Sequence, residues 1–182
     1  IMVAMSGGVD SSVVAALLVA EGHEVTGAFM KNWSDAADPC TGECAWKQER
    51  QDALRVAATL GIPFETFDFE EEYRRDVVEY MVREYASGRT PNPDVMCNSK
   101  VKFDLFLKRS VAAGADMIAT GHYARAERGT DGSVLMLAGA DPGKDQSYFL
   151  HRLTQEQLSR TLFPIGHLLK SDVRKLAAGF GL

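Results

Sequence analysis

The fold is decided by the segment MVAMSGGVDSSVVAALLVAEG, which spans residues 2–22. Its first four residues are apolar and predict a short buried strand. Ser6-Gly7-Gly8 predicts a turn, and the apolar run from Ser11 to Glu21 predicts a helix that ends at Gly22. Two glycines let a backbone approach a phosphate closely, and the amide hydrogens at the start of a helix attract anions. The sequence therefore predicts a phosphate-binding turn between a strand and a helix.

Short apolar strands continue to alternate with helices beyond this segment. The predicted strands span residues 24–30, 64–69 and 116–120, and the predicted helices span residues 43–60, 70–86 and 100–113. This alternation indicates an α/β protein with a parallel sheet that is flanked by helices. Ligands bind such sheets beyond the carboxyl ends of the strands, so we expect Ser6-Gly7-Gly8 and Gly121-His122 to share one edge.

The second part of the chain has a different pattern. Residues 124–127 and 134–138 predict a hairpin around Asp131-Gly132, and helical pieces follow near residues 146–150, 155–160 and 171–178. We therefore expect one catalytic domain over residues 1–182, with a core sheet in about residues 1–123 and an extension in residues 124–182. The last residues resemble a helix end that leads into another element, so we expect the natural protein to continue.

The composition is that of a globular protein able to bury a core, since 46% of the 182 residues are hydrophobic and 25% are charged. The longest apolar run, Val13–Ala20, is too short to span a membrane, and we find no secretory signal. Three cysteines argue against a disulfide scaffold, so we expect a cytoplasmic protein. The net charge of −5 counts against nucleic-acid binding. Residues 83–109 carry a surplus of bases, which a solvated helix face would also explain.

The turn after the first strand indicates a specific chemistry. No Gly-Lys-Ser/Thr follows it, which excludes a Walker loop. The string Ser-Gly-Gly-Val-Asp-Ser instead resembles the PP-loop of the ATP pyrophosphatases, which split ATP into AMP and pyrophosphate and use the AMP to activate a carbonyl oxygen. The resemblance implies an ATP site at the strand end and the turn: Ala4, Met5, Ser6, Gly7, Gly8, Val9, Asp10 and Ser11. We expect Asp10 to help hold Mg²⁺, because a carboxylate oxygen suits that ion.

A second motif, GRTPNPDVMCN, spans residues 88–98 and distinguishes between the members of that superfamily. Its prolines predict a stiff loop that holds Cys97 in one place. The start of a following helix near residues 99–102 would favour the thiolate, which is a strong nucleophile. Asp94 would accept a proton or bind a base edge. The alternative is that Cys97 is a small buried apolar residue.

This second motif closely resembles the tRNA-specific 2-thiouridylases, and the likeness runs nearly from end to end. It implies a Rossmann-like fold of the adenine nucleotide alpha hydrolase type. It also implies that Cys97 is the catalytic nucleophile, that Asp94 assists it, and that Asn92, Pro93 and Asp94 meet the target base of tRNA.

Three further segments resemble the same family. In GAFMKNW, residues 27–33, the resemblance implies that Met30 lies against the adenine. In ATGHY, residues 119–123, it implies that Gly121 binds ATP. In KDQSYFL, residues 144–150, it implies tRNA contacts by Lys144, Asp145 and Gln146. The alternatives are that Met30 is an ordinary core residue and His122 an ordinary turn histidine.

The resemblance also implies a reaction. A flipped wobble uridine of tRNA would enter a pocket between residues 6–12 and residues 92–98. Its C2 oxygen would attack the α-phosphorus of ATP, and sulfur from a persulfide would then displace AMP. In the family a sulfur-relay partner protein supplies the persulfide to a second catalytic cysteine, which lies beyond the end of this chain. We therefore expect this domain to bind ATP but not to complete sulfur transfer by itself.

The sequence leaves several alternatives open. Cys97, Asp94 and the missing cysteine would also suit an iron–sulfur cluster. Cys40 and Cys44 suggest a metal pair, but two thiols do not complete a tetrahedral zinc site, so we favour an incidental loop pair. The alternative functions are an adenylating synthetase for a small metabolite and a non-catalytic domain that binds ATP or tRNA.

Overall fold

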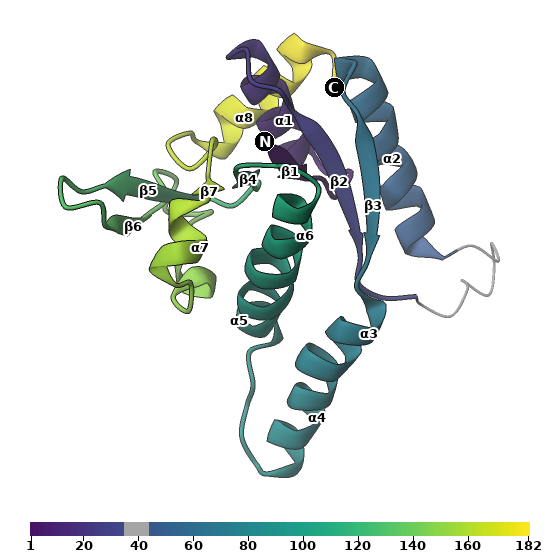
Figure 1. The fold of residues 1–182 in the computed structure, drawn as a ribbon, viewed down its shortest axis with the longest axis vertical. Helices are drawn as coiled ribbons and strands as arrows, with labels where there is room; N and C mark the ends of the chain where they lie inside the picture. The colour runs from purple at the N-terminus through teal and green to yellow at the C-terminus, as the bar shows by residue number, and fades with distance from the viewer. Residues whose placement is uncertain (35–43) are drawn as a thin grey trace.

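The computed structural model describes residues 1–34 and 44–182 (Figure 1). Five parallel strands form one sheet with the order β3-β2-β1-β4-β7, and β5 and β6 form a separate antiparallel pair. The strands are β1 (Met2–Ala4), β2 (Thr26–Lys31), β3 (Phe64–Asp68), β4 (Ile118–Ala119), β5 (Ala124–Arg128), β6 (Val134–Ala138) and β7 (Thr161–Leu162). The predicted α/β class with a parallel sheet is therefore confirmed.

The helices connect these strands and cover the sheet. The α-helices are α1 (Val9–Ala20), α2 (Ala45–Leu60), α3 (Glu70–Tyr73), α4 (Glu79–Ala86), α5 (Pro93–Met96), α6 (Phe106–Ala112), α7 (Gln155–Ser159) and α8 (Lys170–Phe180). Two segments, η1 (Arg74–Val78) and η2 (Cys97–Leu105), are π-helical, and η3 (Ser147–Leu150) is a 3₁₀ helix. Because η1 and η2 each join two α-helices without a break, the chain forms a long helical hairpin that extends away from the sheet (Figure 1).

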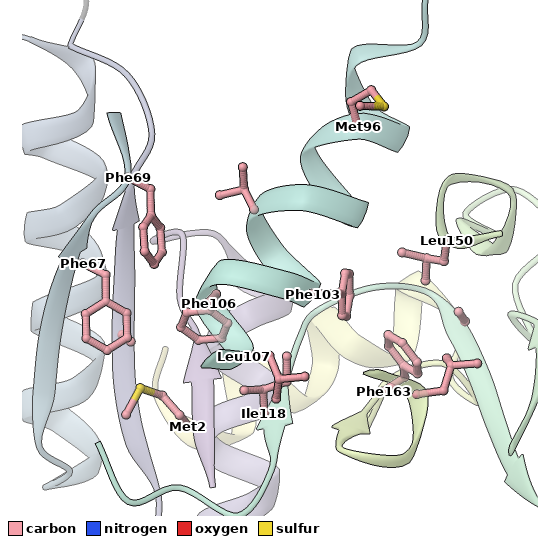
Figure 2. Close-up of a cluster of buried hydrophobic side chains, with 14 of the residues drawn as sticks. Met2, Phe67, Phe69, Met96, Phe103, Phe106, Leu107, Ile118, Leu150 and Phe163 are labelled. Atoms are coloured by element: carbon pink, nitrogen blue, oxygen red, sulfur yellow. The ribbon is translucent and has the colours of Figure 1, made fainter. Parts of the chain in front are cut away.

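Side chains of β1 alternate between two hydrophobic cores, as a strand covered on both faces requires. Val3 packs in one core with residues of α1, α2 and α8. Met2 packs in the other core with Phe103 and Phe106, which face the sheet from η2 and α6 (Figure 2). The sheet is thus held between two layers of helices.

The segment before Cys97 differs from the prediction. We expected a loop over residues 87–98 and a helix from residue 100, but the helix begins at Pro93. Asn92 caps it, because its side-chain oxygen accepts a hydrogen bond from the backbone nitrogen of Val95 at 3.2 Å. Proline suits the first helical position, where its missing amide hydrogen costs nothing. Cys97 therefore lies inside a helix and not in a loop.

The second part of the chain contains the predicted hairpin, β5 and β6, and helical segments near the predicted positions. Strand β7 has no counterpart among the predicted elements. It pairs with β4, with Ile118 opposite Thr161, so a segment beyond residue 123 supplies the fifth strand of the sheet. Within the described part of the chain, no helix is both long and apolar enough to cross a membrane.

The core beneath η2 and α6 gives a test of the packing. Phe106 is fully buried, so Phe106→Ala is expected to lower the free energy of unfolding by about 3–5 kcal/mol. Val111 lies on the same helix and is 39% exposed, so the control Val111→Ala is expected to change it by less than about 0.5 kcal/mol. Urea unfolding measures both values, and equal effects of the two substitutions would contradict this core.

Candidate functional site

A cavity of about 320 Å³ lies beside the turn that follows β1. We call residues 6–11 the glycine turn. The wall combines the glycine turn with the ends of β2 and β4, as the shared carboxyl edge of the sheet predicts. The lining residues are Ala4, Met5, Ser6, Asp10, Ser11, Phe29, Met30, Asn32, Glu49, Lys102, Thr120, Gly121, His122 and Gln146.

Internal hydrogen bonds fix the glycine turn. The Ser11 and Ser12 hydroxyls donate to the Gly8 carbonyl oxygen at 3.1 and 2.9 Å. The Ser6 backbone nitrogen donates to the Ser11 hydroxyl oxygen at 3.2 Å. Gly7 has a φ of +78°, and a Cβ there would come within 2.5 Å of the Glu49 carbonyl oxygen, so only glycine fits. The serine hydroxyls thus hold the turn, and the amides at the start of α1 remain the groups suited to an anion.

Gly121 brings the end of β4 against the first turn of α1. A Cβ at this position would lie 3.0 Å from the Ser11 backbone nitrogen and 3.1 Å from the Asp10 carbonyl carbon. The two turns predicted to share one edge of the sheet are therefore in contact.

The Asp10 carboxylate joins three distant segments of the chain. Its Oδ1 accepts a hydrogen bond from the Tyr123 hydroxyl at 2.9 Å and forms an ion pair with Lys170 Nζ at 2.6 Å. Lys170 Nζ also lies 5.8 Å from the centre of the Tyr123 ring. Burial, followed by the bond to Asp10, raises the pKa of Tyr123, so its hydroxyl stays protonated as the donor. Lys170 is a basic side chain within reach of the glycine turn, and the sequence analysis did not include it.

His122 is buried and neutral. Its Nδ1 is 2.8 Å from the Thr120 hydroxyl, and its ring packs 5.5 Å from the ring of Phe103. Burial, followed by the charge of Lys102, lowers the pKa of His122 to about 3. These contacts satisfy the ring and favour the reading of His122 as a structural turn histidine.

Cys97 is not among the described residues that line the cavity, but it shares the segment η2 with Lys102, which does line it. Burial raises the pKa of its thiol, Lys102 opposes that shift, and Asp94 adds to it. The expectation that a helix start favours the thiolate is therefore wrong, because Cys97 lies behind the first turn of the helix and is half-buried. Lys102 belongs to the cavity wall and acts on the thiol, and thus connects the two.

The three residues of the KDQ segment have different surroundings. Asp145 accepts hydrogen bonds from the Gly139 backbone nitrogen at 2.8 Å and from the Ser147 hydroxyl at 3.0 Å, so its carboxylate holds this loop together. Gln146 lines the cavity, and its side-chain oxygen accepts a hydrogen bond from the Tyr123 backbone nitrogen at 3.0 Å. Lys144 is exposed.

The predicted residues thus divide into three groups. Those that the cavity wall brings together are Ala4, Met5, Ser6, Asp10, Ser11, Met30, Gly121 and Gln146. Those that lie outside the wall are Asn92, Pro93, Asp94, Cys97, Lys144 and Asp145, while Gly7, Gly8 and Val9 belong to the glycine turn itself.

Asn32 is a wall residue that the sequence analysis missed. Its Oδ1 is buried and has no hydrogen-bond partner within the described chain. A buried acceptor of this kind calls for a donor, which a ligand in the cavity would supply. The feature that could have identified Asn32 is its position directly after the second strand, β2.

The positions of the possible metal-binding side chains limit where a metal ion could bind. Among residues 1–34 and 44–182, no three His, Cys, Asp or Glu side chains gather in a way that could hold a metal ion. Asp94 and Cys97 therefore do not form an iron–sulfur site with other described residues. The suggested pair of Cys40 and Cys44 includes Cys40, which lies outside the described residues.

A parallel sheet with a Ser-Gly-Gly-Xaa-Asp-Ser turn at its carboxyl edge defines an α/β domain of the PP-loop class. The chain belongs to the tRNA methyl transferase HUP domain family, whose model matches residues 1–182. It is 56% identical over 98% of its length to the tRNA-specific 2-thiouridylase MnmA of Christiangramia forsetii, of which it covers 46%. It is 53% identical over its full length to the protein of that name from Streptococcus pyogenes serotype M2, of which it covers 48%. The chain thus spans about half the length of these curated relatives.

Two solved structures share the fold. One is a predicted subunit of tRNA methyltransferase from Methanocaldococcus jannaschii, with a TM-score of 0.57, 17% identity and coverage of 97% of this chain and 73% of that one. The other is the NH3-dependent NAD synthetase of Campylobacter jejuni, with a TM-score of 0.55, 17% identity and coverage of 100% of this chain and 63% of that one. At this identity the likeness concerns the fold alone.

The burial of His122 predicts a pH dependence of stability. The pKa of His122 falls from its ordinary value of 6.5 to about 3 on folding, so between these values only the unfolded chain binds this proton. The free energy of unfolding should therefore decrease as the pH falls below 6.5, by up to about 1.4 kcal/mol per pH unit from this group. Urea unfolding at several pH values measures the slope.

The control for this prediction is a second histidine. His122→Gln should remove its share of the slope, whereas replacing the exposed His167 by Gln should leave the slope unchanged. A slope that both variants share with the parent would contradict a neutral, buried His122.

Proposed function

We propose that this chain is the ATP-binding domain of a cytoplasmic tRNA-uridine 2-sulfurtransferase, which converts a wobble uridine of tRNA to 2-thiouridine and releases AMP and pyrophosphate. The observation that carries the proposal is the cavity at the glycine turn, which lies beside the helix of Cys97 in a chain that is 53–56% identical to proteins named tRNA-specific 2-thiouridylase. A small-metabolite synthetase would have no evident use for Cys97.

ATP is proposed to lie in this cavity with its phosphates at the glycine turn. Gly7 and Gly8 leave the backbone open to phosphate oxygens, and the start of α1 offers its amide hydrogens. Met30 and Phe29 would flank the adenine, while Asn32 Oδ1 would accept a hydrogen bond from its amino group. Adenine is thus proposed as the donor for this buried acceptor.

Lys170 is proposed to leave Asp10 when the phosphates arrive. It is 22% exposed and already lies at the glycine turn through its ion pair with Asp10. Phosphate oxygens carry more charge than a single carboxylate and would attract the ammonium group. From this position Lys170 would stabilise the negative charge that builds on the departing pyrophosphate.

Asp10 is the residue proposed to help hold Mg²⁺. Its described contacts involve Oδ1, and the release of Lys170 would leave the Tyr123 hydroxyl as the described partner of that oxygen. A single carboxylate fits this ion, because Mg²⁺ commonly completes its shell with substrate phosphates and water. When bound, the ion would neutralise phosphate charge.

The target uridine is proposed to approach from the side of α5. Its C2 oxygen attacks the α-phosphorus, the bond to pyrophosphate breaks, and the adenylated oxygen becomes a good leaving group. A persulfide from a sulfur-relay protein, carried on the second cysteine of the longer enzyme, attacks C2 and expels AMP. Cys97 then attacks the inner sulfur, which leaves the new sulfur on the base and forms a disulfide that a thiol reductant reopens.

The raised pKa of Cys97 suits this order of events. In the domain without substrate its thiol stays protonated, so it does not compete for the persulfide before the base is activated. Lys102 is the nearby cation that favours the thiolate. Asp94 opposes ionisation, and bringing Asp94 into contact with the target base would relieve that opposition.

The role of Cys97 is tested in the full-length enzyme with tRNA, ATP and a persulfide donor. Cys97→Ser should yield no 2-thiouridine, measured by mass spectrometry of digested tRNA, while ATP binding is retained. Cys44→Ser is the control and should still yield the modified base. Normal 2-thiouridine formation by Cys97→Ser would refute the proposed reaction.

The role of Lys170 is tested by tRNA-dependent release of AMP. Lys170→Met should lower the turnover number by about 10²- to 10³-fold, the usual effect of losing one group that stabilises developing charge. Lys175 lies on the same helix and is paired with Asp172 at the surface, so Lys175→Met should release AMP at the parent rate. Equal rates for both variants would exclude Lys170 from the phosphate site.

A further inference from the structure

Lys102 is a half-buried cation in the wall of the cavity beside the glycine turn. In the part of the chain that the structure describes, no carboxylate lies within ion-pair distance of its ammonium group. Lys31 and Lys170 are also half-buried at the carboxyl edge of the sheet, but each forms an ion pair with an aspartate. A partly buried charge without a counter-charge favours an anionic ligand.

The packing of η2 brings Lys102 to the same space as the glycine turn. The ring of Phe103, the next residue, has its centre 5.5 Å from the centre of the His122 ring. Gly121, which precedes His122, lies against the Ser11 backbone at the start of α1. The cavity volume of about 320 Å³ is at the lower end of the range of about 300–1,000 Å³ for ligand sites. An anion held by the glycine turn is therefore confined to the neighbourhood of Lys102.

Lys102 also belongs to the helical segment that begins with Cys97. Both residues are part of η2, and the charge of Lys102 acts on the thiol against the effect of burial. The same charge acts on His122, another residue of the cavity wall. Lys102 thus lies between the cavity and the sulfur, where one ammonium group can serve either of them.

We propose that Lys102 is a catalytic residue that binds the α-phosphate while AMP is joined to the target uridine, and that its charge passes to the Cys97 sulfur once AMP has left. This inference rests on the proposed function, because it requires an adenylated base next to η2. The α-phosphate joins the nucleotide to the base, so among the phosphates of ATP it must lie nearest the segment that carries Cys97. Lys170, at the glycine turn, then meets the pyrophosphate.

The shared cation gives the reaction an order. While the phosphate occupies Lys102, the Cys97 thiol lacks its nearby cation, and burial together with Asp94 keeps it protonated. When the persulfide expels AMP, the bond between C2 and oxygen breaks and the oxygen leaves with the phosphate. The departure of AMP frees the ammonium group, the thiol loses its proton to solvent, and the thiolate attacks the inner sulfur. Cys97 thus becomes nucleophilic only after the sulfur is on the base.

The first measurement compares AMP with adenosine, which lacks the phosphate, by calorimetry on the full-length enzyme. Lys102→Met should weaken AMP binding by about 10- to 100-fold, as expected for the loss of a hydrogen bond to a charged group, and should leave adenosine affinity unchanged. Lys102→Arg should retain most of the AMP affinity. Lys100 is the matched control, since it is exposed on the same segment, and Lys100→Met should bind AMP like the parent.

The second measurement is the pH dependence of Cys97 alkylation by iodoacetamide, followed by mass spectrometry of the peptide that contains it. The titratable or charged groups described around Cys97 and the adjacent Met96 are Tyr73, Asp94, Lys102 and Arg152. In the parent, saturating AMP should move the midpoint of alkylation to higher pH, because the phosphate takes up the charge of Lys102, and adenosine should not. Lys102→Met should already have the higher midpoint, and AMP should move it less than in the parent.

Several outcomes would overturn the proposal. One is equal AMP affinity of Lys102→Met and the parent, and another is an equal loss of AMP and adenosine affinity, which would mark Lys102 as part of the cavity's structure alone. A shift of the same size on AMP binding in both proteins would also overturn it. So would a lower maximum rate at an unchanged midpoint, which shielding of the sulfur would produce. A parent enzyme that binds neither AMP nor ATP would instead refute the proposed function.

Discussion

The close packing of the end of β4 against the start of α1 is the constraint on which the site depends. At Gly121 a single added carbon would come within 3.0 Å of the Ser11 backbone nitrogen. The space between Gly121 and the start of α1 is too narrow for a side chain. The two turns are therefore in contact, and both contribute residues to the wall of the same cavity. Because the β1 and β4 strands are hydrogen-bonded neighbours, any outward shift of one turn would have to disturb the sheet itself.

Asp10 extends this constraint to the far end of the chain. Its carboxylate contacts Tyr123 and Lys170, which are 113 and 160 residues away in sequence. Helix α8 therefore places a basic side chain, Lys170, at a residue of the cavity wall, although α8 lies near the end of the chain. The extension after residue 123 therefore contributes to both the sheet and the glycine turn: it supplies a strand to one and a cation to the other.

Local patterns predicted much of this molecule. The glycine turn, the parallel sheet and the hairpin follow from features within a few residues, such as paired glycines, short apolar runs and Asp131-Gly132. The helix at Pro93 differs from the prediction because prolines are typical both of loops and of helix starts, and Asn92 before Pro93 is also a helix-start signal. Strand β7 is too short to have a pattern, and the pairing of Lys170 with Asp10 leaves no local trace. The direction of the pKa of Cys97 could not be predicted because burial is a property of the folded chain.

The π-helical form of η2 has a geometric consequence for Cys97. An α-helix turns by about 100° per residue, so side chains five positions apart point in clearly different directions. A π-helix, whose hydrogen bonds join residues i and i+5, has a wider turn that brings such side chains closer to the same side of the helix. Cys97 and Lys102 have this spacing. The wider turn thus keeps Lys102 on the side of the helix where its charge reaches the Cys97 sulfur, so the backbone form of η2 couples the cavity wall to the thiol.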